Sequence, residues 1–130
     1  MDVNQQGCFA EYKFVTECMK RGLNISMPVL HSSIYDCIVD TGKKLVKVQV
    51  KSTKKQPLLI EGQTNRKQNN VQINIENNKK PYLKKYVDFF AVWVEIYDGF
   101  FIFRNTGNIH TIRLSLVGKH SNKFNNFVFD

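Results

Sequence analysis

The stretch that decides the fold is residues 34–53, IYDCIVDTGKKLVKVQVKST. It holds two runs rich in β-branched residues, 34–40 and 43–52, which favour β-strands. Between these runs Gly42 can adopt the positive φ that a tight hairpin turn requires. The sequence therefore predicts an antiparallel β-hairpin at the centre of the fold.

The second strand of this hairpin has one apolar face and one polar face, because successive strand side chains point to opposite sides. Three valines alternate there with three polar residues: Val46, Val48 and Val50 with Lys47, Gln49 and Lys51. If Thr41 and Gly42 form the loop, Asp36 lies opposite Lys47 and diagonal to Gln49, and a longer loop shifts this register. Asp36 has apolar neighbours, so a carboxylate on the polar face with Gln49 and Lys51 requires a cation.

A helix is predicted ahead of the hairpin, from about Gln5 to Arg21, with Gly22 as its C-terminal stop. Glu11 falls at helical spacing on the apolar stripe of this helix, which consists of Phe14, Val15, Cys18 and Met19. A carboxylate on a core-facing stripe is costly unless it has partners. The alternative is that Glu11 lies at the edge of the stripe and reaches solvent or a salt bridge.

The polar face carries the kinds of oxygen that a hard divalent cation binds: the Asp36 carboxylate, the Gln49 amide and the Val50 carbonyl. Metal-assisted phosphodiester cleavage also requires neutralisation of the charge that builds on the attacked phosphate. The Lys51 ammonium suits that role and the orientation of the attacking water, while Glu11 would hold waters of the ion from the helix side. We therefore expect Glu11, Asp36, Gln49 and Lys51 to form a catalytic site around Mg²⁺.

Short motifs in the chain resemble those of the PD-(D/E)XK nucleases: Gly7-x-x-x-Glu11 on the opening helix, Tyr35-Asp36, and Gln49-Val50-Lys51-Ser52-Thr53. The resemblance covers roughly residues 5–104, and the apolar strand that follows Asp88 fits it as well. Within this superfamily the chain is most similar to the small homing endonucleases encoded in bacterial group I introns, and more distantly to archaeal Holliday-junction resolvases.

This resemblance implies an α/β, restriction-endonuclease-like fold with a central mixed sheet flanked by helices. It also implies Mg²⁺-dependent DNA cleavage that leaves 5′-phosphate ends, carried by Glu11, Asp36 and Lys51. The family pattern has Asp or Glu where this chain has Gln49, which removes a negative charge and weakens the case for a tightly bound second metal ion. Two alternatives are a Holliday-junction resolvase of the same fold and a non-catalytic DNA-binding module in which Gln49 marks a lost metal site.

Residues 54–80 differ in character from the rest, with ten Asn or Gln and six Lys or Arg among 27 residues. This segment is expected to protrude from the core, and alternating apolar and polar residues over 71–76 predict that part of it is a strand with one polar face. Lys and Arg suit phosphate contacts, while Arg, Asn and Gln suit base edges in the major groove. The candidate DNA-binding residues are Lys54, Lys55, Arg66, Lys67, Gln68, Asn70, Gln72, Asn74 and Arg113, with Lys119 and Lys123 as lesser candidates. A solvated hairpin is the alternative.

The remaining elements are expected to be mostly strands. They are a first strand over 25–30 that Pro28 interrupts, a turn or short helix over 81–86, a buried hairpin over 89–96 and 100–103, and strand-like segments over 109–116 and 122–130. The three histidines, His31, His110 and His120, lack chelating spacing. Phe124, Phe127 and Phe129 in the last segment either form an interface or cover the domain's own core.

The chain as a whole is basic, with 19 Lys and Arg against 11 Asp and Glu, a net charge of +8 and a pI near 9.5. Such a balance favours a polyanionic partner, double-stranded DNA first and a ribonucleoprotein less so. A length of 130 residues fits a single endonuclease domain, 1–130. Because one chain offers one catalytic centre, cutting both strands implies a homodimer or homotetramer.

Three cysteines, Cys8, Cys18 and Cys37, show no CxxC spacing and sit among apolar residues, which predicts reduced core thiols. The N-terminus has no signal-peptide pattern, and no apolar run approaches the ~20 residues that a bilayer span requires. We therefore expect a cytoplasmic protein with no membrane partner.

Overall fold

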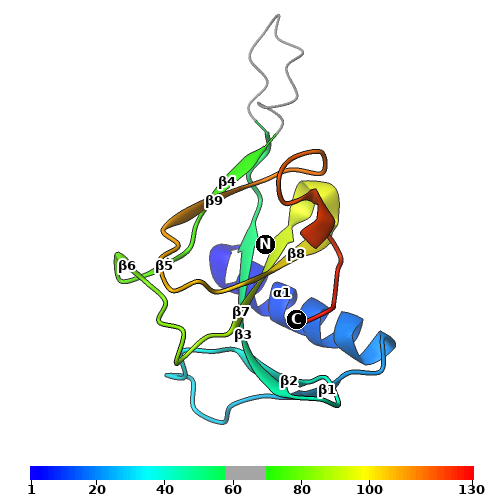
Figure 1. The fold of residues 1–130 in the computed structure, drawn as a ribbon. Helices are drawn as coiled ribbons and strands as arrows, with labels where there is room; N and C mark the ends of the chain where they lie inside the picture. The colour runs from blue at the N-terminus through cyan, green and yellow to red at the C-terminus, as the bar shows by residue number, and fades with distance from the viewer. Residues whose placement is uncertain (58–69) are drawn as a thin grey trace, which may run out of the picture.

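The computed structural model describes residues 1–57 and 70–130, in which a five-stranded mixed sheet has a helix on one face and a two-stranded ribbon on the other (Figure 1). The strand order is β1-β2-β3-β7-β8. These strands are β1 Asn24–Ser26, β2 Cys37–Asp40, β3 Leu45–Thr53, β7 Phe89–Val94 and β8 Gly99–Arg104. Only the central β3 and β7 run parallel, while the other neighbours are antiparallel. The predicted mixed sheet is confirmed.

Helix α1, Val3–Lys20, begins with a capping box. The Asp2 carboxylate accepts a hydrogen bond from the Gln5 N–H at 2.8 Å, and the Gln5 side chain accepts one from the Asp2 N–H at 3.0 Å. The helix ends at Arg21, and Gly22 follows with a φ of +77°. The predicted helix and its glycine stop are confirmed.

The buried stripe of α1 consists of Ala10, Phe14 and Cys18, which pack on the valines of β3. Met19 is 59% exposed, so the predicted stripe was wrong at its C-terminal end. Because the buried side is rotated towards Ala10, Glu11 is half-buried at the edge of the stripe and not in its middle. This edge position lets its carboxylate reach a neighbouring element without entering the core.

The β2–β3 hairpin is present, but its loop has four residues, 41–44, where two were predicted. The Gly42 N–H donates to the Asp40 Oδ1 at 2.9 Å and the Thr41 N–H to the Lys44 carbonyl at 3.0 Å, so side-chain and backbone bonds stabilise the wider turn. Asp40 therefore pairs with Leu45, and the predicted register was wrong. The alternation of faces survives, since a shift of two positions returns each side chain to the same side.

A ribbon covers the sheet face opposite α1, where β4, Val71–Asn74, pairs with β9, Thr111–Leu114. Val71, Ile73 and Leu114 are buried against the apolar residues of β7 and β8, while the other side of β4 is exposed. The predicted strand with one polar face is confirmed. The chain then forms a small hairpin of β5, Glu76–Asn77, and β6, Lys80–Pro81.

The other short elements follow the sequence expectations in part. Strand β1 ends two residues before Pro28, and the β7–β8 hairpin turns through a 3-10 helix, η2 Glu95–Tyr97. After β6 the chain makes a turn over 84–86 and no helix, as one of the two predicted options. Within the described residues, no helix combines the length and apolar character needed to cross a bilayer.

The C-terminal segment covers the core of its own chain. A 3-10 helix, η3 Ser121–Lys123, precedes it, and the strand predicted over 122–130 was wrong. Asn125 has a φ of +50°, which turns the chain away from the sheet. It forms two hydrogen bonds with Phe100 at the edge of β8: its N–H donates to the Phe100 carbonyl, and its Oδ1 accepts from the Phe100 N–H. Phe129 is buried in the apolar cluster between α1 and the sheet, and Phe127 packs on that cluster. Phe124 packs on the second apolar cluster, between the sheet and the ribbon. The core-covering alternative is therefore confirmed for these rings.

All three cysteines are free thiols, two of them buried: Cys18 and Cys37. Burial raises the pKa of the Cys18 thiol to about 12 and the pKa of the Cys37 thiol well above its usual range. The prediction was wrong for Cys8, which lies on the exposed side of α1.

Candidate active site

The candidate site lies where the pairing of β3 with β2 ends, while β3 stays paired with β7 on its other side. β2 pairs with β3 only between Leu45 and Val48, whereas β3 continues to Thr53. Asp36, just before β2, occupies this fork: its N–H donates to the Val48 carbonyl at 2.9 Å and its Oδ2 accepts from the Val50 N–H at 2.7 Å. The N–H and C=O of one strand residue point to the same side, so the Val50 carbonyl faces this open edge as well.

Glu11 reaches the fork from α1 and forms a hydrogen bond with Asp36. Burial is the main cause that raises the pKa of Asp36 to about 7, and the bond to Glu11 and the charge of Glu11 act in the same direction. The Val50 N–H and the Lys51 ammonium act in the opposite direction. Near neutral pH, without a cation, the Asp36 carboxyl group therefore stays partly protonated.

Gln49 and Lys51 approach the same edge from the face opposite α1, where they align with Phe90 and Val92 of the neighbouring β7. The Gln49 Nε2 lies 3.4 Å from the Val50 carbonyl oxygen, a long hydrogen bond. The Lys51 Nζ lies close enough to Asp36 to act on its charge. The structure thus brings together at one edge all the residues predicted for the site: Glu11, Asp36, Gln49, the Val50 carbonyl and Lys51.

The donors at this edge fit a hard divalent cation. They are two carboxylates, one side-chain amide and one backbone carbonyl, all oxygen ligands of the kind that Mg²⁺ prefers. Such a cation can also replace the proton that the Asp36 carboxyl group retains. Among the described residues, no three or more His, Cys, Asp or Glu side chains gather at any point, so Gln49 and Val50 are needed to complete such a ligand set.

The family comes from comparison with known sequences. A family model for PD-(D/E)XK endonuclease matches residues 1–127. This chain belongs to the PD-(D/E)XK endonuclease family. The fold agrees, since the bacterial homing endonuclease I-Ssp6803I has a similar structure, with a TM-score of 0.71 over 95% of this chain and 87% of that chain at 19% identity. No curated protein sequence matches the chain. The predicted family and fold are confirmed.

The candidate DNA-binding residues of this PD-(D/E)XK endonuclease gather in part on the exposed face of the β4–β9 ribbon. Gln72 lies opposite Arg113 and Asn74 opposite Thr111, and all four are exposed. Thr111 was not predicted, because its place opposite Asn74 depends on a pairing between distant segments. Arg66, Lys67 and Gln68 lie outside the described residues.

The two lysines that follow β3 are exposed and bind backbone carbonyls of other segments. The Lys55 Nζ donates to the Gln72 carbonyl at 3.1 Å, and the Lys54 Nζ donates to the Met1 carbonyl at 2.6 Å. These contacts connect the end of β3 with the ribbon and with the start of α1. A further bond, from the Gln6 Nε2 to the Ser52 Oγ at 3.2 Å, holds α1 against β3 beside the site.

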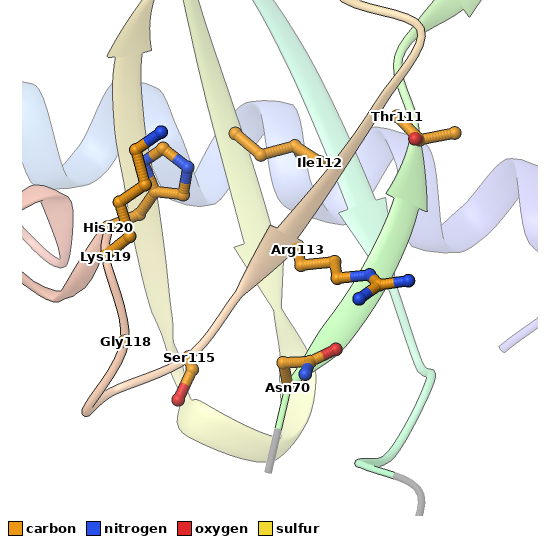
Figure 2. A pocket seen from close by; sticks show the side chains of 8 residues that line it. All are labelled: Asn70, Thr111, Ile112, Arg113, Ser115, Gly118, Lys119 and His120. Atoms are coloured by element: carbon orange, nitrogen blue, oxygen red, sulfur yellow. The ribbon is translucent and has the colours of Figure 1, made fainter. Parts of the chain in front are cut away.

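A polar hollow lies beside β9, as Figure 2 shows. Its lining consists of Asn70, Thr111, Ile112, Arg113, Ser115, Gly118, Lys119 and His120, and no acidic residue is among these described residues. Lys119 and His120 lie on one side of the strand and the Arg113 guanidinium on the other (Figure 2). Burial, then the charges of Lys119 and Lys123, lower the pKa of His120. The hollow extends the basic character of the ribbon.

Proposed function

We propose that this protein is a Mg²⁺-dependent homing endonuclease that hydrolyses both strands of double-stranded DNA at a specific site. The observation that carries the proposal is the hydrogen-bonded carboxyl pair Glu11–Asp36 beside Lys51 and the Val50 carbonyl, in a member of the PD-(D/E)XK family. The structural likeness to a bacterial homing endonuclease supports the finer assignment. We infer that residues 1–130 form one endonuclease domain that acts in the cytoplasm.

Asp36, Gln49 and the Val50 carbonyl would hold Mg²⁺, which when bound supplies positive charge that acidifies a water and polarises the attacked phosphate. The Val50 N–H fixes the orientation of the Asp36 carboxylate. Glu11 accepts hydrogen bonds from waters on the α1 side. Lys51 orients the attacking water and neutralises the charge that builds on the phosphate. The attacking water forms a P–O bond and gives up a proton, while the P–O3′ bond breaks and the 3′ oxygen takes up a proton, which leaves a 5′-phosphate and a 3′-hydroxyl.

The ribbon offers a surface for reading DNA. Gln72, Asn74 and Arg113 can form hydrogen bonds with base edges, and the exposed lysines Lys54 and Lys55 can contact phosphates. The net charge of +8 attracts the protein to the polyanionic DNA and favours their association. Since each chain carries one candidate site, we propose that a homodimer or homotetramer makes the double-strand cut.

A non-catalytic DNA-binding module is the second candidate, and one observation favours it. Gln49 replaces the expected acid, and its amide nitrogen points to the Val50 carbonyl, so a hydrogen-bond donor occupies the place of a metal ligand. Nitrogen and oxygen of such an amide exchange places by a flip of the group, which would turn the oxygen towards the same point. Cleavage assays separate the two functions.

The test incubates the purified protein with a long DNA library and with a four-way junction, each with Mg²⁺ or with EDTA. Lys51→Ala is the active-site variant, and Lys43→Ala, an exposed turn lysine, is the control with the same loss of charge. Mg²⁺-dependent cuts at a rare site, lost in Lys51→Ala and kept in Lys43→Ala, are the expected result. Symmetrical cuts in the junction alone would indicate a resolvase, and binding of both DNAs without cleavage would indicate a binding module.

A further inference from the structure

Tyr82 forms the floor of the candidate site on the face opposite α1. The side chain is 7% exposed, and its ring meets Phe90 edge to face, with the centroids 5.4 Å apart. Phe90 aligns with Gln49 across the parallel β3–β7 pair, so the Tyr82 ring that packs on Phe90 lies beneath the polar face of β3. The Lys51 Nζ lies 5.0 Å from the centroid of the Tyr82 ring, within the range of a cation–π contact.

The buried amide of Asn105 fixes the backbone that carries this ring. Its Nδ2 donates to the carbonyls of Tyr82 at 3.0 Å and Val87 at 2.9 Å, and its Oδ1 accepts from the Gly107 N–H at 2.9 Å. Asn105 is 3% exposed and directly follows β8, which belongs to the central sheet. Both ends of the turn after β6 are therefore tied to the sheet, and Tyr82 is a fixed part of the site.

We propose that Tyr82 is a positioning residue that holds the Lys51 ammonium over its ring and keeps it available to the scissile phosphate. The inference rests on the proposed function, because Lys51 acts on the phosphate only if the site cleaves DNA. A lysine beside Asp36 has a competing option, which is direct pairing with that carboxylate. The π face offers the ammonium a neutral partner, so that its charge is not neutralised by the Asp36 carboxylate proposed to bind the metal ion.

A ring contact of this kind corresponds to about a 3- to 30-fold effect on a rate. Tyr82→Leu removes the π face and keeps an apolar side chain, whereas Tyr82→Phe keeps the ring and removes only the hydroxyl. Phe103→Leu is the matched control, since Phe103 is also buried and packs on Phe90 from another side, with centroids 5.6 Å apart. All three variants are compared in single-turnover cleavage at saturating Mg²⁺ and DNA, together with their affinity for DNA.

We expect Tyr82→Leu to cleave 3- to 30-fold more slowly at unchanged DNA affinity, while Tyr82→Phe and Phe103→Leu keep the wild-type rate. In a Lys51→Ala background the Tyr82→Leu change should have no further effect, because the residue acts through the lysine. Equal rates for Tyr82→Leu and wild type would overturn the proposal. So would a Tyr82→Phe rate as low as that of Tyr82→Leu, since the hydroxyl and not the ring would then be at work.

A second readout does not depend on cleavage or on the stability of a variant. In the wild-type protein, the ring current of Tyr82 should shift the ε-CH₂ proton resonances of Lys51 upfield of those of a solvated lysine. The shift should persist in Tyr82→Phe. A wild-type spectrum without it contradicts the positioning role even if DNA is cleaved. Conversely, a shifted resonance in a protein that cleaves no DNA keeps the contact and rejects the proposed function.

Discussion

The carboxyl group of Asp36 lies between a second carboxyl group, that of Glu11, and a backbone N–H, that of Val50, which act on its charge in opposite directions. Burial and Glu11 prevail, and the pKa of Asp36 rises to about 7. The group is therefore largely protonated at mildly acidic pH in the folded chain, while it is ionised above about 4 in the unfolded chain. This difference makes folding stability depend on pH.

The first prediction concerns this pH dependence in EDTA. A raised folded pKa means that the native state retains a proton which the unfolded state releases, so stability falls as the pH rises from about 4 to about 7. Two other carboxylates, Glu17 and Glu76, act in the opposite direction. Their hydrogen bonds to Arg21 and His110 lower their pKa values, so the stability that they contribute is lost as the pH falls. They are common to wild type and Asp36→Asn, so the difference in melting temperature between the two proteins isolates Asp36.

We expect the wild type to lose melting temperature relative to Asp36→Asn across this window, as measured by thermal unfolding at closely spaced pH values. Mg²⁺ at pH 7 should restore stability to the wild type and not to the variant, because only the carboxylate exchanges its proton for the cation. Parallel pH profiles for the two proteins would contradict the raised pKa of Asp36.

The second prediction concerns the departure at Gln49. Gln49→Glu should retain part of the Mg²⁺-dependent cleavage and reach half its maximal rate at a lower Mg²⁺ concentration, because a carboxylate binds a hard cation more strongly than an amide does. Asp36→Ala and Gln49→Ala should lose most of the activity, and Lys51→Ala about 10²- to 10³-fold. Single-turnover rates over a Mg²⁺ titration give both quantities. An Asp36→Ala protein with full activity would remove the basis of the site.

The sequence predicted which residues form this site better than it predicted the strand register and the helix position that bring them together. Asp36 and Gln49 were placed on one face by alternation, and this held although the loop is two residues longer, because faces repeat every second residue. Glu11 was placed on the helix stripe, yet it lies at the edge of that stripe, where the fork is within reach. Tyr82 gave no local signal, since its contact with Lys51 joins segments that only the folded chain brings together.

At the scale of elements, the β4–β9 ribbon joins polar residues from two distant segments into one exposed face. The third prediction is that Arg113→Ala weakens DNA binding, whereas Arg104→Ala, an exposed arginine at the end of β8, does so much less. If Arg113 binds a phosphate, the loss is similar for all sequences and the salt dependence of the affinity falls by about one ion. If it binds a base, near-cognate sites gain relative to the cognate site.

Titration of cognate, near-cognate and random duplexes at several salt concentrations measures both effects. Equal affinities and salt slopes for Arg113→Ala and Arg104→Ala would mean that the ribbon does not face DNA.

Element prediction was least successful where a side chain replaces a backbone pairing. The aromatic residues over 122–130 favoured a strand. In the structure, the Asn125 Oδ1 accepts the Phe100 N–H that a strand carbonyl would otherwise take, and the positive φ of Asn125 ends the pairing after one bridge. The use of a side-chain acceptor in place of a backbone carbonyl depends on one amide in one rotamer, and hydrophobic periodicity cannot detect it.

At the scale of the whole molecule, a double-strand cut depends on assembly. The described residues hold one candidate site, at the fork of β2 and β3, and the two strands of a duplex require two attacks of opposite polarity. The rings of Phe124, Phe127 and Phe129 are engaged with the chain's own core, so a partner chain would use another surface. Two-fold symmetry would then place two sites against the two strands.

The fourth prediction follows from that symmetry. If wild type is mixed with an excess of Lys51→Ala under conditions in which subunits exchange, most active assemblies contain one competent site for each target. Supercoiled plasmid should then accumulate as nicked circles, while wild type alone gives linear product with little nicked intermediate. Sedimentation of the protein with its DNA should give a mass of two or four chains. A mixture that yields less linear product without nicked circles, from a protein that sediments as a single chain, would mean that one subunit cuts both strands in turn.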